Sequence, residues 1–211
     1  MINGVMVTEE EYKKAQENYS DDSPIPLGHE LILSESVIEG AFSEITNWKE
    51  CYKKIVYSSK GLESWYRFSL YDVTGDDIPE LFISYGLYRL NPCCVYSFQN
   101  GLMPIGYIGT YGSIAYSPSK DLFYNYEFWQ GHKYFIYYTL DEDNNFQCEV
   151  SLHNNEKAAQ SEGKTKYEIN NKEVTYDEYK KVLDQYSKID DYIYLGLDYD
   201  LNIDQKIILL E

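Results

Sequence analysis

Eight short apolar runs dominate the middle of the chain. They are rich in β-branched and aromatic residues, as β-strands are, and they cover Trp65–Tyr71, Glu80–Tyr85, Cys93–Phe98, Leu102–Ile108, Ser113–Ser117, Tyr124–Phe128, Lys133–Leu140 and Phe146–Leu152. Asn100-Gly101 stands between two runs and is a strong signal for a two-residue hairpin, and Asp141–Asn145 has the composition of a second turn. Consecutive strands with such short connections predict an antiparallel meander rather than alternating strands and helices.

A helical period precedes these strands. Apolar side chains recur at steps of three and four residues, at Phe42, Ile45, Trp48, Tyr52, Ile55 and Val56. This spacing is typical of an amphipathic helix, which Gly61 ends. We expect its apolar stripe to pack against the sheet rather than to bind a partner. The Pro-containing stretch Asp21–Gly28 separates this helix from the first residues of the chain.

The two ends of the chain carry copies of one motif. INGVMVTEEEYKKAQENYS (Ile2–Ser20) and INNKEVTYDEYKKVLDQYS (Ile169–Ser187) are identical at ten of nineteen positions, at a shift of 167 residues. Each copy has a dipeptide that favours a tight turn, followed by Thr and Glu at the spacing of a helix capping box. The dipeptides are Asn3-Gly4 and Asn170-Asn171, and the capping pairs are Thr8 with Glu11 and Thr175 with Glu178. The motif is therefore predicted to be a hairpin followed by a helix.

Two explanations of this repeat stay open. Residues 1–20 are either the tail of a preceding module in a tandem array, which we favour, or one end of a single domain that uses the motif twice. Residues 30–211 are predicted to form a single α+β domain, an antiparallel β-meander flanked by N-terminal helices and a C-terminal helix over Thr175–Ser187. Beyond it, Asp190–Leu197 resembles a strand. Leu201–Leu210 resembles a helix capped by Asp200, with a further strand as the alternative.

The net charge of the chain limits the classes of molecule that it is expected to bind. The 211 residues include 35 Asp and Glu against 18 Lys and Arg, for a formal net charge of −17. Such a chain does not grip nucleic acid or anionic lipid through a general basic surface, so we expect no nucleic acid partner. Tyr is unusually abundant, with 24 residues. This reflects either codon bias together with the strand preference of Tyr or an aromatic surface for a protein or carbohydrate.

The sequence predicts no membrane span, because no apolar run approaches the ~20 residues that a spanning helix needs. The segment Met1-Ile2-Asn3-Gly4 also lacks the basic start of a secretory leader. As given, the chain is expected to be soluble, and cytoplasmic if it is complete. A lipid anchor or leader upstream would place it at the cell surface or outside the cell.

The usual catalytic and metal-binding patterns are weak in this sequence. The cysteines, Cys51, Cys93, Cys94 and Cys148, have no CxxC spacing and are expected to be buried free thiols, with the adjacent pair on opposite faces of a strand. The histidines, His29, His132 and His153, have no helical ligand spacing, and His132 beside Gly131 is expected to be a solvated turn residue. The glycines Gly106, Gly109 and Gly112 lack the dinucleotide-binding spacing, and Ser113 lacks a nucleophile elbow.

The sharpest local motif is LYDVTGDDIPEL, residues 70–81. Asp72, Thr74 and Asp76 occupy positions 1, 3 and 5 of a calcium loop, and the carbonyl of Ile78 and the side chain of Glu80 complete a tentative set of ligands. The pattern is incomplete, because position 6 is Asp77 rather than Gly and position 12 is Ile83. The sequence therefore leaves two interpretations, a calcium site that includes Asp77 as an additional candidate or a plain turn between two strands.

These residues carry a resemblance. Together with Trp48–Tyr52 and Ile169–Thr175, the segments FSLYD (68–72) and PELFI (79–83) resemble uncharacterised secreted or lipoprotein-type domains of Gram-positive bacteria. Those domains have a YDIDGDGxPEL segment that is similar to the calcium loops of dockerin and integrin-type repeats. Asp72, Asp76 and Glu80 match that segment, whereas Thr74 and Asp77 depart from it. The resemblance implies an extracellular or cell-surface domain without catalytic activity.

Three functions follow as hypotheses. The leading one is a non-catalytic secreted or cell-surface binding or structural module, with Ca²⁺ as a stabilising ion and an unidentified protein or carbohydrate as partner. The alternative is an acidic intracellular inhibitor or immunity-type protein, whose negative surface covers the basic site of a partner. The third is a hydrolase with two close carboxylates, for which no motif stands out among the 35 acidic residues.

Overall fold

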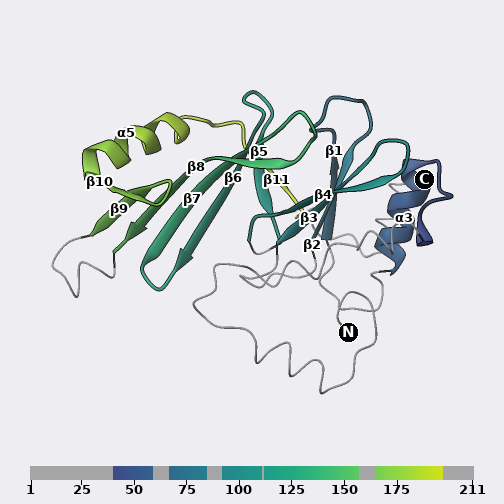
Figure 1. Ribbon diagram of the computed structural model, residues 1–211, viewed down its shortest axis with the longest axis horizontal. Helices are drawn as coiled ribbons and strands as arrows, with labels where there is room; N and C mark the ends of the chain where they lie inside the picture. The colour runs from purple at the N-terminus through teal and green to yellow at the C-terminus, as the bar shows by residue number, and fades with distance from the viewer. Residues whose placement is uncertain (1–39, 59–66, 85–91, 111, 157–164, 197–211) are drawn as a thin grey trace, which may run out of the picture.

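The computed structural model describes residues 40–58, 67–84, 92–110, 112–156 and 165–196, and its elements are labelled as in Figure 1. The helices in these ranges are α3 (Trp48–Ser58) and α5 (Tyr176–Tyr186). One sheet contains β1 (Arg67–Tyr71), β2 (Glu80–Ser84), β3 (Cys93–Phe98) and β4 (Leu102–Ile108). The other contains β5 (Ile114–Ser117), β6 (Leu122–Trp129), β7 (His132–Leu140), β8 (Phe146–Asn155), β9 (Lys166–Ile169), β10 (Lys172–Val174) and β11 (Ile193–Leu195). The fold is α+β.

The meander is confirmed, but it divides into two sheets. The four-stranded sheet has the order β1-β2-β3-β4 and the seven-stranded sheet the order β10-β9-β8-β7-β6-β5-β11, with every pair antiparallel. Each of the eight predicted runs overlaps a strand, and β6, β7 and β8 extend beyond the predicted bounds. Asn100 and Gly101 both have positive φ, at 59° and 151°, as the hairpin signal between β3 and β4 requires.

The first helix is shorter than its apolar period predicts. Helix α3 begins after Asn47, whose side-chain oxygen accepts hydrogen bonds from the backbone N–H groups of Lys49 (2.8 Å) and Glu50 (3.4 Å). An Asn at this position accepts hydrogen bonds from N–H groups that have no partner within the helix. The cap at Asn47 therefore determines where the helix begins. Phe42 lies in the turn before α3 and is nevertheless buried.

Helix α3 covers one face of the four-stranded sheet. Its buried face, with Tyr52, Ile55 and Val56, packs in one cluster with the strand residues Leu81, Ile83 and Tyr96. The Tyr52 hydroxyl donates a hydrogen bond to the carbonyl oxygen of Tyr96, 3.2 Å away. The predicted packing of the stripe against the sheet is therefore confirmed.

The other face of the four-stranded sheet packs on the seven-stranded sheet. Phe82 and Val95 contact Ile114, Tyr116 and Phe123 in a second cluster. Cys93 belongs to this cluster and Cys94 to the one under α3, as expected for neighbours in a strand. All four cysteines are free. Three are buried, whereas Cys148 is exposed, so the expectation of buried thiols is wrong for Cys148.

The second copy of the repeated motif has the predicted structure. Asn170 and Asn171 have φ of 51° and 62° and join β9 to β10. Thr175 then caps α5 in a complete capping box with Glu178. Tyr179 of α5 is buried in a third cluster against the seven-stranded sheet. The first copy, within residues 1–20, and the predicted segment Leu201–Leu210 lie outside the described residues.

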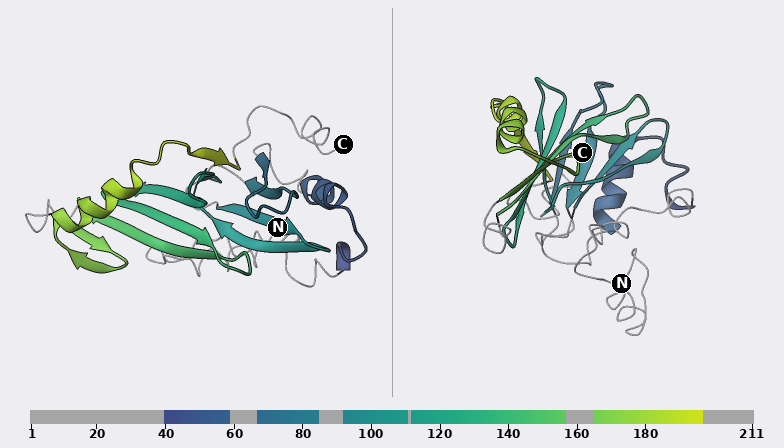
Figure 2. Two further views of the ribbon diagram at one scale, coloured as in Figure 1. Left: turned by 90° about the horizontal axis from the view of Figure 1, so that it is seen from above. Right: turned by 60° about the vertical axis from the view of Figure 1, so that its left-hand side comes forward.

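Helices α3 and α5 lie at opposite ends of the described structure (Figures 1 and 2). Strands β6, β7 and β8 are long enough to run from the contact with the four-stranded sheet to the region under α5. One edge of the seven-stranded sheet is β11, which lies within the predicted strand Asp190–Leu197 and begins at Ile193 rather than Asp190, and Leu197 lies outside the described residues. Among the described residues, no helix is long and apolar enough to cross a membrane.

Candidate functional site

The candidate calcium loop connects β1 to β2 and is closed by its own hydrogen bonds. The Asp72 carboxylate accepts the backbone N–H groups of Gly75 (2.7 Å) and Asp77 (3.0 Å). The Asp76 carboxylate accepts the N–H of Ile78 at 2.9 Å. Gly75 and Asp77 have φ of 76° and 65°. Asp often tolerates this left-handed conformation, so Asp77 can replace the Gly of a calcium loop without breaking the turn.

Glu80 follows the loop as the first residue of β2, and its side chain is fully buried. Its carboxylate accepts three hydrogen bonds, from the Val73 N–H (2.9 Å), the Ser97 hydroxyl (3.1 Å) and the Thr74 hydroxyl (3.2 Å). Burial raises the pKa of Glu80 above its usual range. The like charge of Asp76 adds to this rise, whereas the three hydrogen-bond donors lower the pKa. A buried carboxylate with only neutral donors is costly to ionise.

The loop thus has some of the chemistry that a hard cation needs. Asp72, Asp76 and Glu80 bring three carboxylates to one end of β2, and carboxylate oxygens retain lone pairs after accepting one hydrogen bond. Within the described ranges, however, no group of three or more His, Cys, Asp or Glu side chains is arranged to hold a metal ion. Calcium binding at Asp72, Thr74, Asp76, Ile78 and Glu80 therefore remains a prediction.

A second polar constellation lies on the seven-stranded sheet. His132 Nδ1 and His153 Nε2 are 2.9 Å apart, and the other ring nitrogen of His153 is 2.9 Å from Glu168 Oε2. The three residues come from β7, β8 and β9, and the His153 and Glu168 side chains are 16% and 33% exposed. The Tyr134 ring stacks on His153 with 4.4 Å between ring centroids and 6° between planes.

The sequence-based expectation of a solvated turn histidine is wrong for His132. In the pairing of β7 with β8, Asn155 lies opposite His132 and His153 lies opposite Tyr134. His153 is therefore the diagonal neighbour of His132 on the same face of the sheet, within reach of its Nδ1. Glu168 joins because β9 places it opposite His153. Side chains on alternate residues of adjacent strands share one face. The register of these pairs was the missing signal, because 20 residues separate the two histidines in the chain.

Exposed aromatic side chains are concentrated at the end of β6. The side chains of Tyr126, Phe128 and Trp129 are 44%, 49% and 44% exposed. They are three of the six exposed large hydrophobic side chains among the described residues. The Gln130-Gly131 turn follows, with φ of 48° and 87°, and leads into β7. We call Tyr126–Gly131 the aromatic tip.

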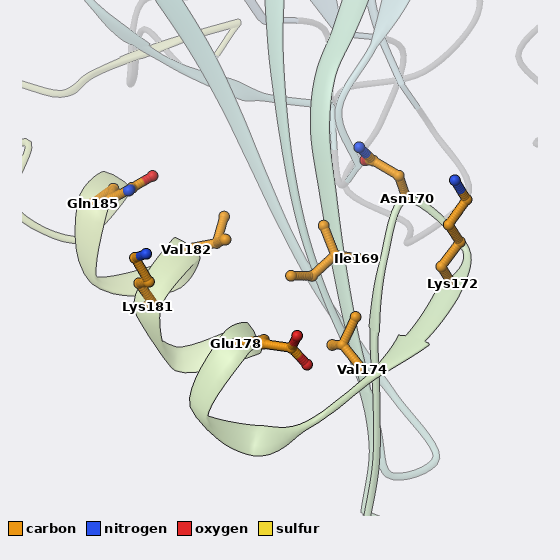
Figure 3. Close-up of a pocket in the computed structure, with 8 residues that line it drawn as sticks. All are labelled: Ile169, Asn170, Lys172, Val174, Glu178, Lys181, Val182 and Gln185. Atoms are coloured by element: carbon orange, nitrogen blue, oxygen red, sulfur yellow. The ribbon is translucent and has the colours of Figure 1, made fainter.

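A groove of about 490 Å³ runs between α5 and the β9–β10 hairpin (Figure 3). Ile169, Val174 and Val182 contribute its apolar wall and belong to the core cluster under α5. Its only carboxylate, Glu178, is engaged in the capping box with Thr175. The groove is therefore part of the packing of the helix on the hairpin.

Two glycines of the series, Gly109 and Gly112, lie between β4 and β5, and Gly106 lies within β4. Gly109 and Gly112 have φ of 82° and 73°. A Cβ at Gly109 would collide with the carbonyl oxygen of Ser113. The backbone approach at this turn requires glycine at position 109 for space as well as for conformation.

Comparisons with known proteins identified no relative of this chain. No family model matches the chain, and no curated protein or solved structure matches it either.

Proposed function

We propose that the chain is a non-catalytic binding module and that the aromatic tip is its contact surface. The observation that carries this proposal is the exposure of Tyr126, Phe128 and Trp129 at one end of β6. Exposed aromatic groups gathered in this way are typical of interaction surfaces. Scattered single apolar residues would need no such explanation.

The arrangement of the tip favours a protein partner. Because side chains alternate along a strand, Tyr126 and Phe128 lie on one face of the sheet and Trp129 on the other. A flat sugar ring stacks on one face of an aromatic platform, whereas a ridge with rings on both sides fits a groove between protein elements. Aromatic residues such as Trp and Tyr are also frequent among the residues that dominate protein–protein binding energy.

A photo-crosslinker at position 128 tests this proposal. The variant Phe128→p-benzoylphenylalanine is incubated with intact source cells and with their soluble fraction, and adducts are identified by mass spectrometry. The matched control is Met103→p-benzoylphenylalanine, because Met103 is 47% exposed and lies on β4, in the other sheet. We expect one protein adduct, at least about tenfold more abundant from position 128. Equal labelling from both positions, or binding only to a glycan array, would contradict a protein partner at the tip.

We also propose an extracytoplasmic location and Ca²⁺ at the β1–β2 loop. The support is the buried Glu80 beside Asp72 and Asp76, because a divalent cation would offset three carboxylates. Extracellular calcium modules bind with dissociation constants of 10⁻⁴–10⁻³ M. At 10 mM Ca²⁺, binding in this range would stabilise the fold by about 1.4–2.7 kcal/mol.

Thermal unfolding at pH 7 with and without Ca²⁺ measures that stabilisation. Asp76→Asn should remove it. The control is Asp141→Asn, because Asp141 is an exposed turn aspartate that accepts similar backbone hydrogen bonds in another loop. An unfolding midpoint that does not respond to 10 mM Ca²⁺ would discard the cation and leave the plain turn.

The net charge of −17 favours a second candidate function, an acidic inhibitor of a protein with a basic site. Long-range attraction of that kind weakens as salt screens the charges. Raising the ionic strength from 0.05 to 0.5 M should then abolish the tip adduct, whereas an aromatic contact should persist. The outcome distinguishes the two functions.

A further inference from the structure

The segment Ile169–Gly196 completes the seven-stranded sheet and includes β10, α5 and β11. Strands β10 and β11 are the two edges of that sheet, and α5 packs on one of its faces. We call Ile169–Gly196 the closing segment. Its contacts with the rest of the fold identify the side chains by which a sheet of this kind holds such a segment.

Two residues of the closing segment bind β8. The backbone N–H of Asn170 donates to the carbonyl oxygen of Ser151, and the side-chain oxygen of Asn170 accepts the N–H of Ser151, both at 2.8 Å. The hydroxyl of Tyr179 accepts a hydrogen bond from the side-chain amide of Asn154 at 3.2 Å. Tyr179 is buried, so its contact combines a polar partner with loss of apolar surface to water.

Two further residues extend the contact to β7 and to the β5–β6 turn. The ring of Tyr186 stacks on Tyr137 of β7, with 4.2 Å between ring centroids and 24° between planes. The carboxylate of Asp191 accepts hydrogen bonds from the Ser117 hydroxyl and from the backbone N–H of Ser119. The closing segment is therefore held along its whole length.

Gly196 ends the closing segment and joins it to the four-stranded sheet. Its backbone N–H donates to the hydroxyl oxygen of Ser69 in β1 at 2.8 Å. Its φ is 81°, and a Cβ at this position would lie 2.6 Å from the carbonyl oxygen of Gly112 and 2.8 Å from the sulfur of Cys93. Only glycine fits these conditions.

All five of these docking residues recur near the start of the chain. The repeat extends beyond Ser20, because DDSPIPLG (21–28) resembles DDYIYLG (190–196) when Pro24 and Lys188-Ile189 are left unpaired. The corresponding pairs are Asn3 and Asn170, Tyr12 and Tyr179, Tyr19 and Tyr186, Asp22 and Asp191, and Gly28 and Gly196. We call Ile2–Gly28 the first copy. It carries each side chain that docks the closing segment, together with the glycine that no other residue can replace.

The first copy is the weaker competitor for the sheet of its own chain. Ala15 and Gln16 stand where the closing segment has Val182 and Leu183, which pack against the core cluster under α5. Less apolar surface would be buried by the first copy. The closing segment is also tethered to β8, which raises its effective concentration at the sheet. One chain thus has two segments for one sheet, and the closing segment holds it.

We propose that the first copy, Ile2–Gly28, docks on the seven-stranded sheet of a second copy of this fold, in the place of that copy's closing segment. The contact surface on the partner consists of β7 and β8, the β5 edge and Ser69. In a tandem array the partner would be the preceding module. The proposal does not depend on the aromatic tip having a partner.

The test uses two full-length chains. The acceptor carries Asn170→Ala and Tyr179→Ala, which weaken its closing segment, and Tyr12→Ala, which disables its own first copy. The donor is the unchanged chain. Far-UV circular dichroism verifies that the acceptor is folded. A milder acceptor, with Tyr186→Ala in place of Tyr179→Ala, is used if it is not.

Sedimentation velocity of the mixture measures binding, and amide exchange of an isotope-labelled acceptor locates it. We expect a one-to-one complex in which exchange of the Ser151 amide slows at least about tenfold, because Asn3 supplies the oxygen that Asn170→Ala removes. The donor variant Ala15→Val with Gln16→Leu should bind roughly tenfold more tightly, because it restores the apolar contacts of the closing segment.

Donor variants provide the discriminating result. Tyr12→Ala should weaken binding at least about 100-fold, because a ring that is buried at the corresponding Tyr179 is lost. Lys13→Ala is the matched control and should bind as the unchanged donor does, because the corresponding Lys180 is exposed and pairs with Asp184 of its own helix. No complex with a folded acceptor, equal binding by Tyr12→Ala, or an unchanged Ser151 amide would overturn the proposal.

Discussion

The two sheets differ sharply in how much of each strand is buried. Every residue of β2 and β3 is buried, whereas Tyr137 is the only buried residue of β7. The four-stranded sheet is covered on one face by α3 and on the other by the seven-stranded sheet. The seven-stranded sheet is covered by the four-stranded sheet at one end and by α5 on the opposite face.

Strand β6 shows both environments within eight residues. Leu122 and Phe123 at its start are buried, and Phe128 and Trp129 at its end are exposed. Sequence chemistry is similar at the two ends, so position in the tertiary structure decides their roles. The four-stranded sheet and the start of β6 supply stability, and the far end of the seven-stranded sheet supplies accessible surface.

Truncating a ring in each region should give the largest difference. Phe82→Ala removes a fully buried ring whose centroid is 6.4 Å from that of Phe123 and should destabilise the fold by about 3–5 kcal/mol. Phe128→Ala should cost less than about 0.5 kcal/mol, because its ring is half exposed. Urea unfolding of both variants measures the two values. Similar costs would mean that the far end of the sheet is as tightly packed as the centre.

The pH dependence of stability should also differ between the regions, with an effect smaller than that of Phe82→Ala. Burial raises the pKa of Glu80 above its ordinary value of 4.5, so the folded state binds this proton more tightly than the unfolded state. Stability from this group is present below pH 4.5 and is lost as the pH rises through the raised pKa. Glu80→Gln should therefore flatten the decline in stability above pH 4.5 in the absence of Ca²⁺.

Asp141, in the turn between β7 and β8, should behave in the opposite way. Hydrogen bonds, led by that from the backbone N–H of Asn145, lower its pKa below the ordinary value of 3.8. Its contribution is present above pH 3.8 and is lost as the pH falls through the lowered pKa. Unfolding midpoints of Glu80→Gln and Asp141→Asn from pH 3 to pH 8 test both signs. Parallel pH profiles for the two variants would contradict the assigned environments.

A further, modest effect is expected at the cap of α5. Thr175→Ala removes the side chain that accepts the backbone N–H of Glu178 and should destabilise the fold by about 1 kcal/mol. Thr175→Ser retains a hydroxyl and should behave almost as the original. Thermal unfolding of both variants gives the comparison. If Thr175→Ala lowered the stability of the fold as much as Phe82→Ala does, α5 would contribute far more to that stability than its cap and its partly buried face indicate.

Local features of the fold were predictable from neighbouring residues alone. The Asn100-Gly101 hairpin and the Asn170-Asn171 turn depend on side chains that accept positive φ. The capping box of Thr175 and Glu178 depends on a spacing of three residues. Strand β1 and the seven strands after it follow from short apolar runs bounded by turn residues. The start of α3 was misplaced because the apolar period continues through Phe42, before the cap at Asn47.

By itself the sequence determined the strands, the turns, the second capped helix and an α+β class, because each depends on interactions among residues close in the chain. Only the tertiary structure decided that the meander divides into two sheets, that Glu80 is buried, and that His132, His153 and Glu168 form one chain of hydrogen bonds. Those outcomes depend on strand register and on which faces pack together. A shift of register by one residue would move each histidine to the other face of the sheet, and the apolar runs and turn residues did not reveal in advance which residues stand opposite each other.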